Sequence, residues 1–196
     1  MGSRAGKGSS FEREVCKKLS LWWTTGQDDD VFWRTSGSGA RAKTRSKKNK
    51  TTFGQCGDIQ ATNPIGQPLI DLCSIELKRG YSKATFADLL DRSPEAKEQV
   101  YEEFVLQAEL DSTNAQAKSW MLIVKRDRRQ ALLFIPFELY KHLRRAGCLF
   151  ESCYVSAFVR FLDKKGVERT LFIGHLDRFL SIVQPHHIQE VLEQWD

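Results

Sequence analysis

The stretch GQCGDIQATNPIGQPLIDLCSIELKRG, residues 54–80, decides the fold of this chain. At its end, Glu76 and Lys78 stand two residues apart within the apolar segment SIELKRG. Side chains alternate between the two faces of a strand, so this spacing predicts that Glu76 and Lys78 point the same way. Most Glu-x-Lys pairs are ion pairs on a solvated face, but the apolar neighbours favour a buried pair here. Asp58 precedes a second apolar segment and, taken alone, is typical of a turn.

Working outward from this stretch, the hydrophobic pattern predicts an α/β fold. A first helix is expected over 9–23, with Ser9 as its N-cap and Glu12 closing a capping box. Three strands are expected within 31–34, 57–62 and 69–80, paired as an antiparallel meander, and 37–54 should be a polar loop. After residue 80, we expect a short helical piece in 82–94, a helix over 94–110 and a strand over 117–127. A further strand after 128 is expected to run into a helix that ends near 145. The remainder is expected to form a hairpin over 152–175 and one or two helices over 176–196.

The domain organisation follows from the absence of repeats and obvious linkers. We expect a single domain over residues 1–196, with a core over about 7–136 and a C-terminal elaboration over about 137–196. The first ten residues lack the apolar core of a secretory signal, and no apolar run is long enough to cross a membrane. Five cysteines without a CxxC pair are typical of reduced thiols. These features predict a cytoplasmic protein.

The charge is unevenly spread along the chain. There are 30 basic and 25 acidic residues, which gives a net charge of +5. Residues 31–57 contain no acidic side chain, and their basic residues are Arg34, Arg41, Lys43, Arg45, Lys47, Lys48 and Lys50. A basic block of this kind suits a polyanion such as nucleic acid. Arg34 and Ser36, directly before the loop, are either an ordinary strand end or the first phosphate contacts.

Glu12 lies on the apolar side of the predicted first helix, whereas Glu14 lies outside it. The apolar arc is formed by Phe11, Val15, Cys16, Leu19, Trp22 and Trp23. Two interpretations of Glu12 stay open. It either completes the capping box with Ser9, or it faces inward, where a carboxylate needs a partner or a metal.

Together these residues predict a metal-dependent phosphodiesterase. Asp58 and Glu76 can supply carboxylate oxygens to a hard divalent cation from neighbouring strands, and Glu12 can reach it directly or through water. Such a cation polarises a phosphoryl oxygen and lowers the pKa of a bound water. Lys78 can orient or deprotonate that water and offset the charge that develops on the phosphate.

The order of these motifs resembles the PD-(D/E)XK nuclease superfamily. FEREV in a helix, RTSGS after a strand, then GDI and IELK are most similar to archaeal-type Holliday junction resolvases and related phage-encoded nucleases, over about residues 7–136. The resemblance implies a restriction-endonuclease-like fold, with a central mixed β-sheet flanked by helices. It also implies Mg²⁺ or Mn²⁺ as cofactor, double-stranded or branched DNA as substrate, and a homodimer. A bacterial or phage-infected cell is the setting that the resemblance implies. The residue roles it implies are Glu12, Asp58 and Glu76 for the metal, Lys78 as catalytic lysine, and Arg34 and Ser36 for phosphate or junction contact.

Two departures from the family pattern keep other interpretations open. Gly57 stands where the family name places proline, and the segment between Arg34 and Asp58 is longer than a minimal resolvase would have. A restriction-type or repair nuclease with another DNA preference, a nuclease acting on RNA, and a non-catalytic nucleic-acid-binding protein of the same fold are the alternatives.

Two further candidates have equally plain structural explanations. Gln107 shares a helix face with Val100 and Phe104, where related nucleases often carry a polar residue near the active site. It is otherwise a glutamine near a helix end. The basic segment VKRDRRQ, residues 124–130, is either a solvated turn or a second phosphate contact.

Overall fold

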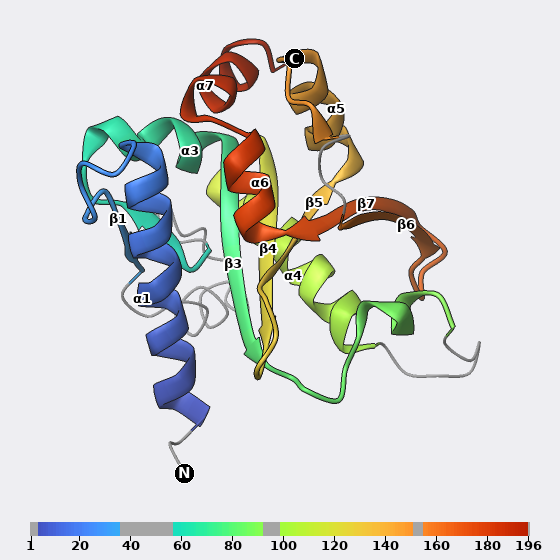
Figure 1. Ribbon diagram of the computed structural model, residues 1–196. Helices are drawn as coiled ribbons and strands as arrows, with labels where there is room; N and C mark the ends of the chain where they lie inside the picture. The colour runs from blue at the N-terminus through green and yellow to red at the C-terminus, as the bar shows by residue number, and fades with distance from the viewer. Residues whose placement is uncertain (1–3, 36–56, 92–98, 151–154, 196) are drawn as a thin grey trace.

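The computed structural model describes residues 4–35, 57–91, 99–150 and 155–195, and these residues surround a five-stranded sheet (Figure 1). In spatial order its strands are β3 (Cys73–Gly80), β4 (Ser119–Arg126), β5 (Leu132–Pro136), β7 (Glu168–His175) and β6 (Ser156–Leu162). The β3–β4 pair is parallel, and the β4–β5, β5–β7 and β7–β6 pairs are antiparallel. The predicted α/β class with a central mixed sheet is therefore confirmed.

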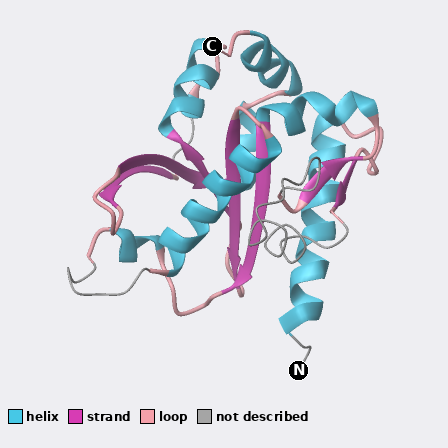
Figure 2. Cartoon of the chain, turned by 180° about the vertical axis from the view of Figure 1, so that it is seen from behind, coloured by secondary structure: helices cyan, strands magenta, loops and turns pink. Residues whose placement is uncertain are grey.

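Helices cover both faces of this sheet. One face packs against α1 (Arg4–Trp23), α3 (Gln67–Leu72), α5 (Phe137–Arg145), α6 (Leu176–Ile182) and α7 (Pro185–Glu193). The other face packs against α4 (Val100–Ala115) and the short 3-10 helix η2 (Phe86–Leu89), and Figure 2 shows α4 lying across it. Within the described ranges, no helix combines the length and the apolar character that a membrane span requires.

The register of β3 and β4 fixes the direction of the Glu-x-Lys pair. Glu76 is paired with Leu122 and Lys78 with Val124, and both β4 residues are buried in the cluster beneath α4. Paired residues on neighbouring strands point to the same face, so Glu76 and Lys78 face α4. The intervening Leu77 belongs to the cluster on the α1 face.

The predicted antiparallel pairing of the first two strands is confirmed, but the third strand of the predicted meander is wrong. β1 (Phe32–Arg34) and β2 (Ile59–Ala61) form an antiparallel ladder of their own, and β3 pairs with β4 in the other sheet. The backbone N–H of Asp58 donates to the Ile75 carbonyl at 2.7 Å, which ties the start of β2 to the edge of β3. The short ladder therefore serves mainly to hold Asp58 against that edge.

Two predicted boundaries are also wrong. Residues 69–72 begin no strand, because α3 occupies them: Leu69 and Leu72 are buried at i, i+3 spacing, and a proline lies in the first helical turn, where its missing N–H costs nothing. α3 follows directly on the 3-10 helix η1 (Pro64–Gly66). Helix α1 begins at Arg4, so Ser9 lies inside it and is not the N-cap.

The segment after residue 136 continues the same sheet. The β6–β7 hairpin predicted around the DKKG turn is confirmed, and residues 171–175 of β7 pair with the whole of β5. Two C-terminal helices are present, and Pro185 begins the second of them. The C-terminal elaboration is thus built onto the core sheet.

Candidate active site

Asp58 is locked to the outer edge of β3 by its backbone and by its side chain. Besides the bond to the Ile75 carbonyl, its Oδ2 atom accepts a hydrogen bond from the Leu77 N–H at 2.8 Å. The Thr35 N–H donates to the Asp58 carbonyl at 3.0 Å. The carboxylate is only 8% exposed, so it is held beside the Glu-x-Lys segment with little freedom to turn away.

Gly57 allows this close approach of the two chains. Its φ is +80°, and a Cβ atom there would lie 2.8 Å from Ser74 Oγ and 3.0 Å from the Ile75 carbonyl oxygen. A side chain therefore meets both a left-handed backbone and a fixed neighbouring strand. This explains why glycine stands before Asp58, at the position that the superfamily name gives to proline.

We expect Gly57→Ala to lower the free energy of unfolding by about 2–3 kcal/mol, because backbone strain and crowding against β3 add together. Urea denaturation measures the loss. Gly26→Ala is the matched control, since Gly26 has a similar φ of +89° and nothing within 4 Å of its added Cβ. Equal losses for the two variants would show that the crowding against β3 has no effect.

Glu76 and Lys78 form a direct ion pair on the α4 face of β3. Their side chains are 8% and 18% exposed, so the pair is buried and the solvated-face interpretation is wrong. The Lys78 ammonium also lies 5.4 Å from the centre of the Phe104 ring on α4. A desolvated cation is attracted to the face of an aromatic ring, so Phe104 helps to hold the ammonium in place.

Burial and neighbouring charge make Glu76 a weak acid. Desolvation, followed by the charge of Asp58, raises the pKa of Glu76 to about 7, although Lys78 opposes the rise. Burial lowers the pKa of the Lys78 ammonium, but the charge and hydrogen bond of Glu76 outweigh burial and leave that pKa raised. Two carboxylates thus share one buried ammonium, and the site has an affinity for additional positive charge.

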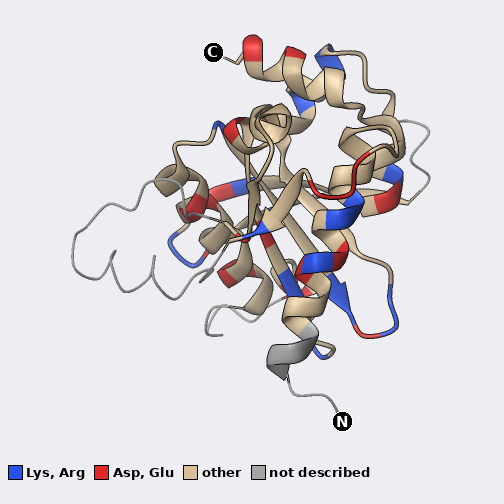
Figure 3. Ribbon diagram, turned by 90° about the vertical axis from the view of Figure 1, so that its left-hand side faces the viewer, with Lys and Arg blue, Asp and Glu red and all other residues tan. Residues whose placement is uncertain are grey.

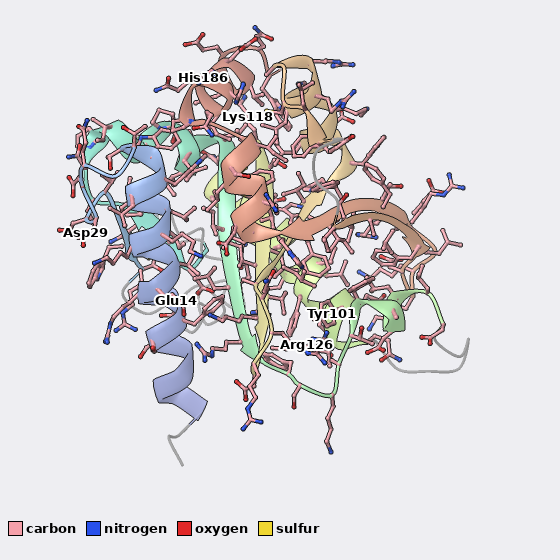
Figure 4. All side chains as sticks on the ribbon, in the orientation of Figure 1. Glu14, Asp29, Tyr101, Lys118, Arg126 and His186 are labelled. Carbon is pink, nitrogen blue, oxygen red and sulfur yellow. The ribbon has the colours of Figure 1, made fainter. Side chains whose placement is uncertain are left out.

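Glu12 faces inward from α1, as the helical wheel predicts, and its side chain is 19% exposed. Its Oε2 atom lies 3.3 Å from Arg34 Nη1, and both its charge and that of Asp58 raise the pKa of the buried Cys16 thiol. Glu12 therefore lies in the neighbourhood of Asp58, and the capping-box interpretation is wrong because the helix begins earlier. Glu14 points elsewhere and pairs with Lys125 at 2.6 Å (Figure 4).

Most of the predicted DNA-binding residues lie outside the described residues. These are Ser36, Arg41, Lys43, Arg45, Lys47, Lys48 and Lys50. Arg34 is described: it ends β1 with a side chain that is 37% exposed, beside Glu12. Figure 3 shows further basic residues around the turn between β4 and β5.

Asp111 is a residue of this region that the sequence analysis missed. It is 7% exposed on α4, and its charge contributes to the raised pKa of Glu76. Gln107 Nε2 donates to Asp111 Oδ1 at 2.8 Å, so the glutamine is oriented by a buried carboxylate one turn further on. The i, i+4 spacing from Gln107 was the available signal, since it places both side chains on one helix face.

The donor set fits a hard divalent cation. Asp58 and Glu76 bring carboxylate oxygens to one strand edge, and the buried Ser74 hydroxyl, on the same face as Glu76, has no hydrogen-bond partner among the described residues. Mg²⁺ takes oxygen ligands and keeps several waters, which such a hydroxyl can hold in place. In the described ranges, no three acidic, histidine or cysteine side chains converge on a complete metal cage.

A family model described as "Phage putative PDDEXK endonuclease" matches residues 3–190, which is nearly the whole chain. The chain belongs to this family. The resemblance to PD-(D/E)XK nucleases of phage origin is thereby confirmed, and the matched region reaches well beyond residue 136. Comparisons with curated proteins and with solved structures gave no significant match. Membership of this endonuclease family identifies the chain as a nuclease, while its metal and its DNA preference belong to the proposal below.

Proposed function

We propose that this PDDEXK endonuclease hydrolyses phosphodiester bonds of DNA with Mg²⁺ or Mn²⁺, and that branched DNA such as a Holliday junction is its substrate. One observation carries the chemistry: Asp58 is bonded to the backbone of the same strand whose buried face presents Glu76 and Lys78. A binding protein has no need to bury two carboxylates and an ammonium together, since their desolvation is costly.

In this proposal each residue has a separate task. Asp58 and Glu76 hold the cation, and Glu12 supports it directly or through water. Bound there, a divalent cation would supply polarisation of the phosphoryl oxygen and a water of lowered pKa. Lys78 keeps its proton, orients the attacking water and offsets the negative charge of the transition state. Gln107 and Asp111 support this arrangement from α4, and the hydrogen bond from the Leu77 N–H fixes the position of the Asp58 carboxylate.

The DNA contacts are assigned to the basic residues on the β1 side of the site. Arg34 is half-buried next to Glu12 and is proposed to contact the phosphate that is cleaved or its neighbour. Ser36 and the basic residues of 41–50, which lie outside the described residues, follow Arg34 in the sequence and are proposed as further phosphate contacts. Paired nicks in a junction need two active sites, so we propose a homodimer as the acting unit.

Cleavage of a labelled four-way junction and of a linear duplex with the same arm sequence tests the proposal. We expect symmetric nicks in the junction with Mg²⁺ or Mn²⁺ and none in EDTA, because the carboxylates act through the cation. Glu76→Gln should be inactive under all conditions. Glu103→Gln is its matched control, since Glu103 lies exposed on α4, and it should cleave like the wild type.

Equal cleavage of both substrates would overturn the junction preference and keep the nuclease. Cleavage that persists in EDTA would overturn the metal requirement. Binding of DNA without any cleavage would favour the non-catalytic protein instead. Single-stranded DNA and RNA of the same sequence complete the comparison. Hydrolysis of RNA alone would show that the enzyme is a ribonuclease.

A further inference from the structure

The pocket that begins directly after the catalytic segment has no role in the chemistry described above. Its volume is about 560 Å³, and it is lined by residues 79–84 at and after the end of β3, by Val100 at the start of α4 and by Asp127 in the β4–β5 turn. Volumes of about 300–1,000 Å³ are typical of small-molecule sites. The first lining residue immediately follows Lys78, so the pocket lies at the end of β3 that carries Lys78.

Tyr81 lines this pocket and has an unusual backbone conformation. Its φ is +29°, which a residue other than glycine rarely adopts, and its side chain is left 49% exposed. Its ring meets the Phe104 ring edge-on, with centroids 4.7 Å apart and an angle of 75°. Strained backbone of this kind costs of order 1–3 kcal/mol and is concentrated at functional sites. The fold thus keeps an aromatic face exposed at a conformational cost.

Phe104 couples Tyr81 to the catalytic lysine. The same ring that packs on Tyr81 lies 5.4 Å from the Lys78 ammonium. The two side chains therefore occupy one neighbourhood on the α4 face of β3. A group stacked on Tyr81 would share this neighbourhood with the Lys78 ammonium.

The charges around the pocket favour an anionic, flat ligand. Lys83 lines the wall of the pocket and is exposed. Arg126 on β4 lies opposite Gly80 of β3, and its charge opposes the burial that raises the pKa of nearby Tyr101 (Figure 4). Asp127 is the acidic member of the lining. Aromatic faces with neighbouring cations bind single nucleotides, since the ring stacks on the base and the cations meet the phosphate.

Resting on the proposed function, we infer that Tyr81 stacks on the base of a nucleotide that is displaced from the DNA helix next to the scissile phosphate. A base inside an intact duplex is already stacked on both sides and offers no face to Tyr81. The pocket therefore selects DNA whose strands are opened at the cleavage point, as at a branch or a bulge. It would supply part of the preference for DNA structure that the active site alone cannot give.

Equilibrium binding in EDTA tests this inference without a cleavage step. The probe is a duplex with one bulged 2-aminopurine, compared with the same duplex carrying an abasic bulge. We expect Tyr81→Ala to weaken binding of the 2-aminopurine probe roughly 5- to 150-fold, the equivalent of about 1–3 kcal/mol per stacked base. The abasic probe should bind the variant and the wild type equally, and 2-aminopurine should be quenched by the wild type and by Tyr81→Phe only.

Tyr81→Gly separates stacking from folding. Glycine relieves the left-handed backbone, so this variant should be at least as stable as the wild type and still lose the same affinity as Tyr81→Ala. Equal affinity of wild type and Tyr81→Ala for the 2-aminopurine probe, with junction cleavage intact, overturns this inference alone. Failure of the wild type to bind any of the DNA probes overturns it together with the proposed function.

Discussion

Asp58→Asn is expected to lower the cleavage rate by more than about 100-fold, beyond the roughly 10–100-fold that losing an outer-shell partner of a metal ligand costs. The amide has the shape of the carboxylate and can still accept from the Leu77 N–H, so the contact with β3 is kept. The charge that attracts the cation is lost. Single-turnover cleavage of a junction with Mg²⁺ measures the effect.

DNA binding by Asp58→Asn should be retained or strengthened, because a negative charge next to the phosphate is removed. Anisotropy in EDTA measures this separately from cleavage. Asp29→Asn is the control, since Asp29 is exposed and pairs with Lys17 away from β3. Cleavage by Asp58→Asn at the rate of the control would remove Asp58 from the active site, whatever its contacts.

Local periodicity was enough to predict how the Glu-x-Lys pair lies on β3. The alternation that places Glu76 and Lys78 on one face is a property of any strand, and the apolar neighbours indicated that this face is buried. The inward direction of Glu12 was predicted from the helical wheel in the same way. These inferences need no knowledge of which elements pack together.

Pairing between distant elements could not be predicted in this way. The pattern of 69–80 reads as one apolar run, and only the packing of Leu69 and Leu72 against the core shows that its first part is helical. β3 pairs with β4 across an intervening helix, and no local signal distinguishes this from a meander with β2. Tyr81 was missed for the same reason, because its exposure and its φ depend on how α4 closes over β3.

The brace between the C-terminal hairpin and α4 was also invisible in the sequence. Arg169 on β7 donates from Nε and Nη2 to the two Glu109 oxygens at 2.9 and 2.8 Å, and from Nη1 to Asp163 Oδ2 at 2.6 Å. Asp163 also accepts the N–H groups of Lys165 and Val167, both at 2.8 Å. These three charged side chains join the β6–β7 turn to the helix that covers Glu76.

We expect Arg169→Met to lower the free energy of unfolding by about 2–4 kcal/mol. Removing the guanidinium leaves Asp163, whose side chain is 1% exposed, without its cation, and breaking a buried pair costs about 3–5 kcal/mol. The expected loss is smaller than that of a fully buried pair, because the Glu109 side chain is 34% exposed and regains water when the guanidinium is removed. Urea denaturation measures the loss, and cleavage at low temperature should persist, because no group of the active site is changed.

Arg160→Met is the matched control on the same hairpin. Arg160 is 71% exposed and lies 4.0 Å from Glu168, so its loss should change the free energy of unfolding by less than about 0.5 kcal/mol. Similar losses for the two variants would mean that the Arg169 network stabilises nothing. A large loss for Arg169→Met alone would show that the C-terminal hairpin braces α4, and through it the buried face of β3 where Glu76 and Lys78 lie.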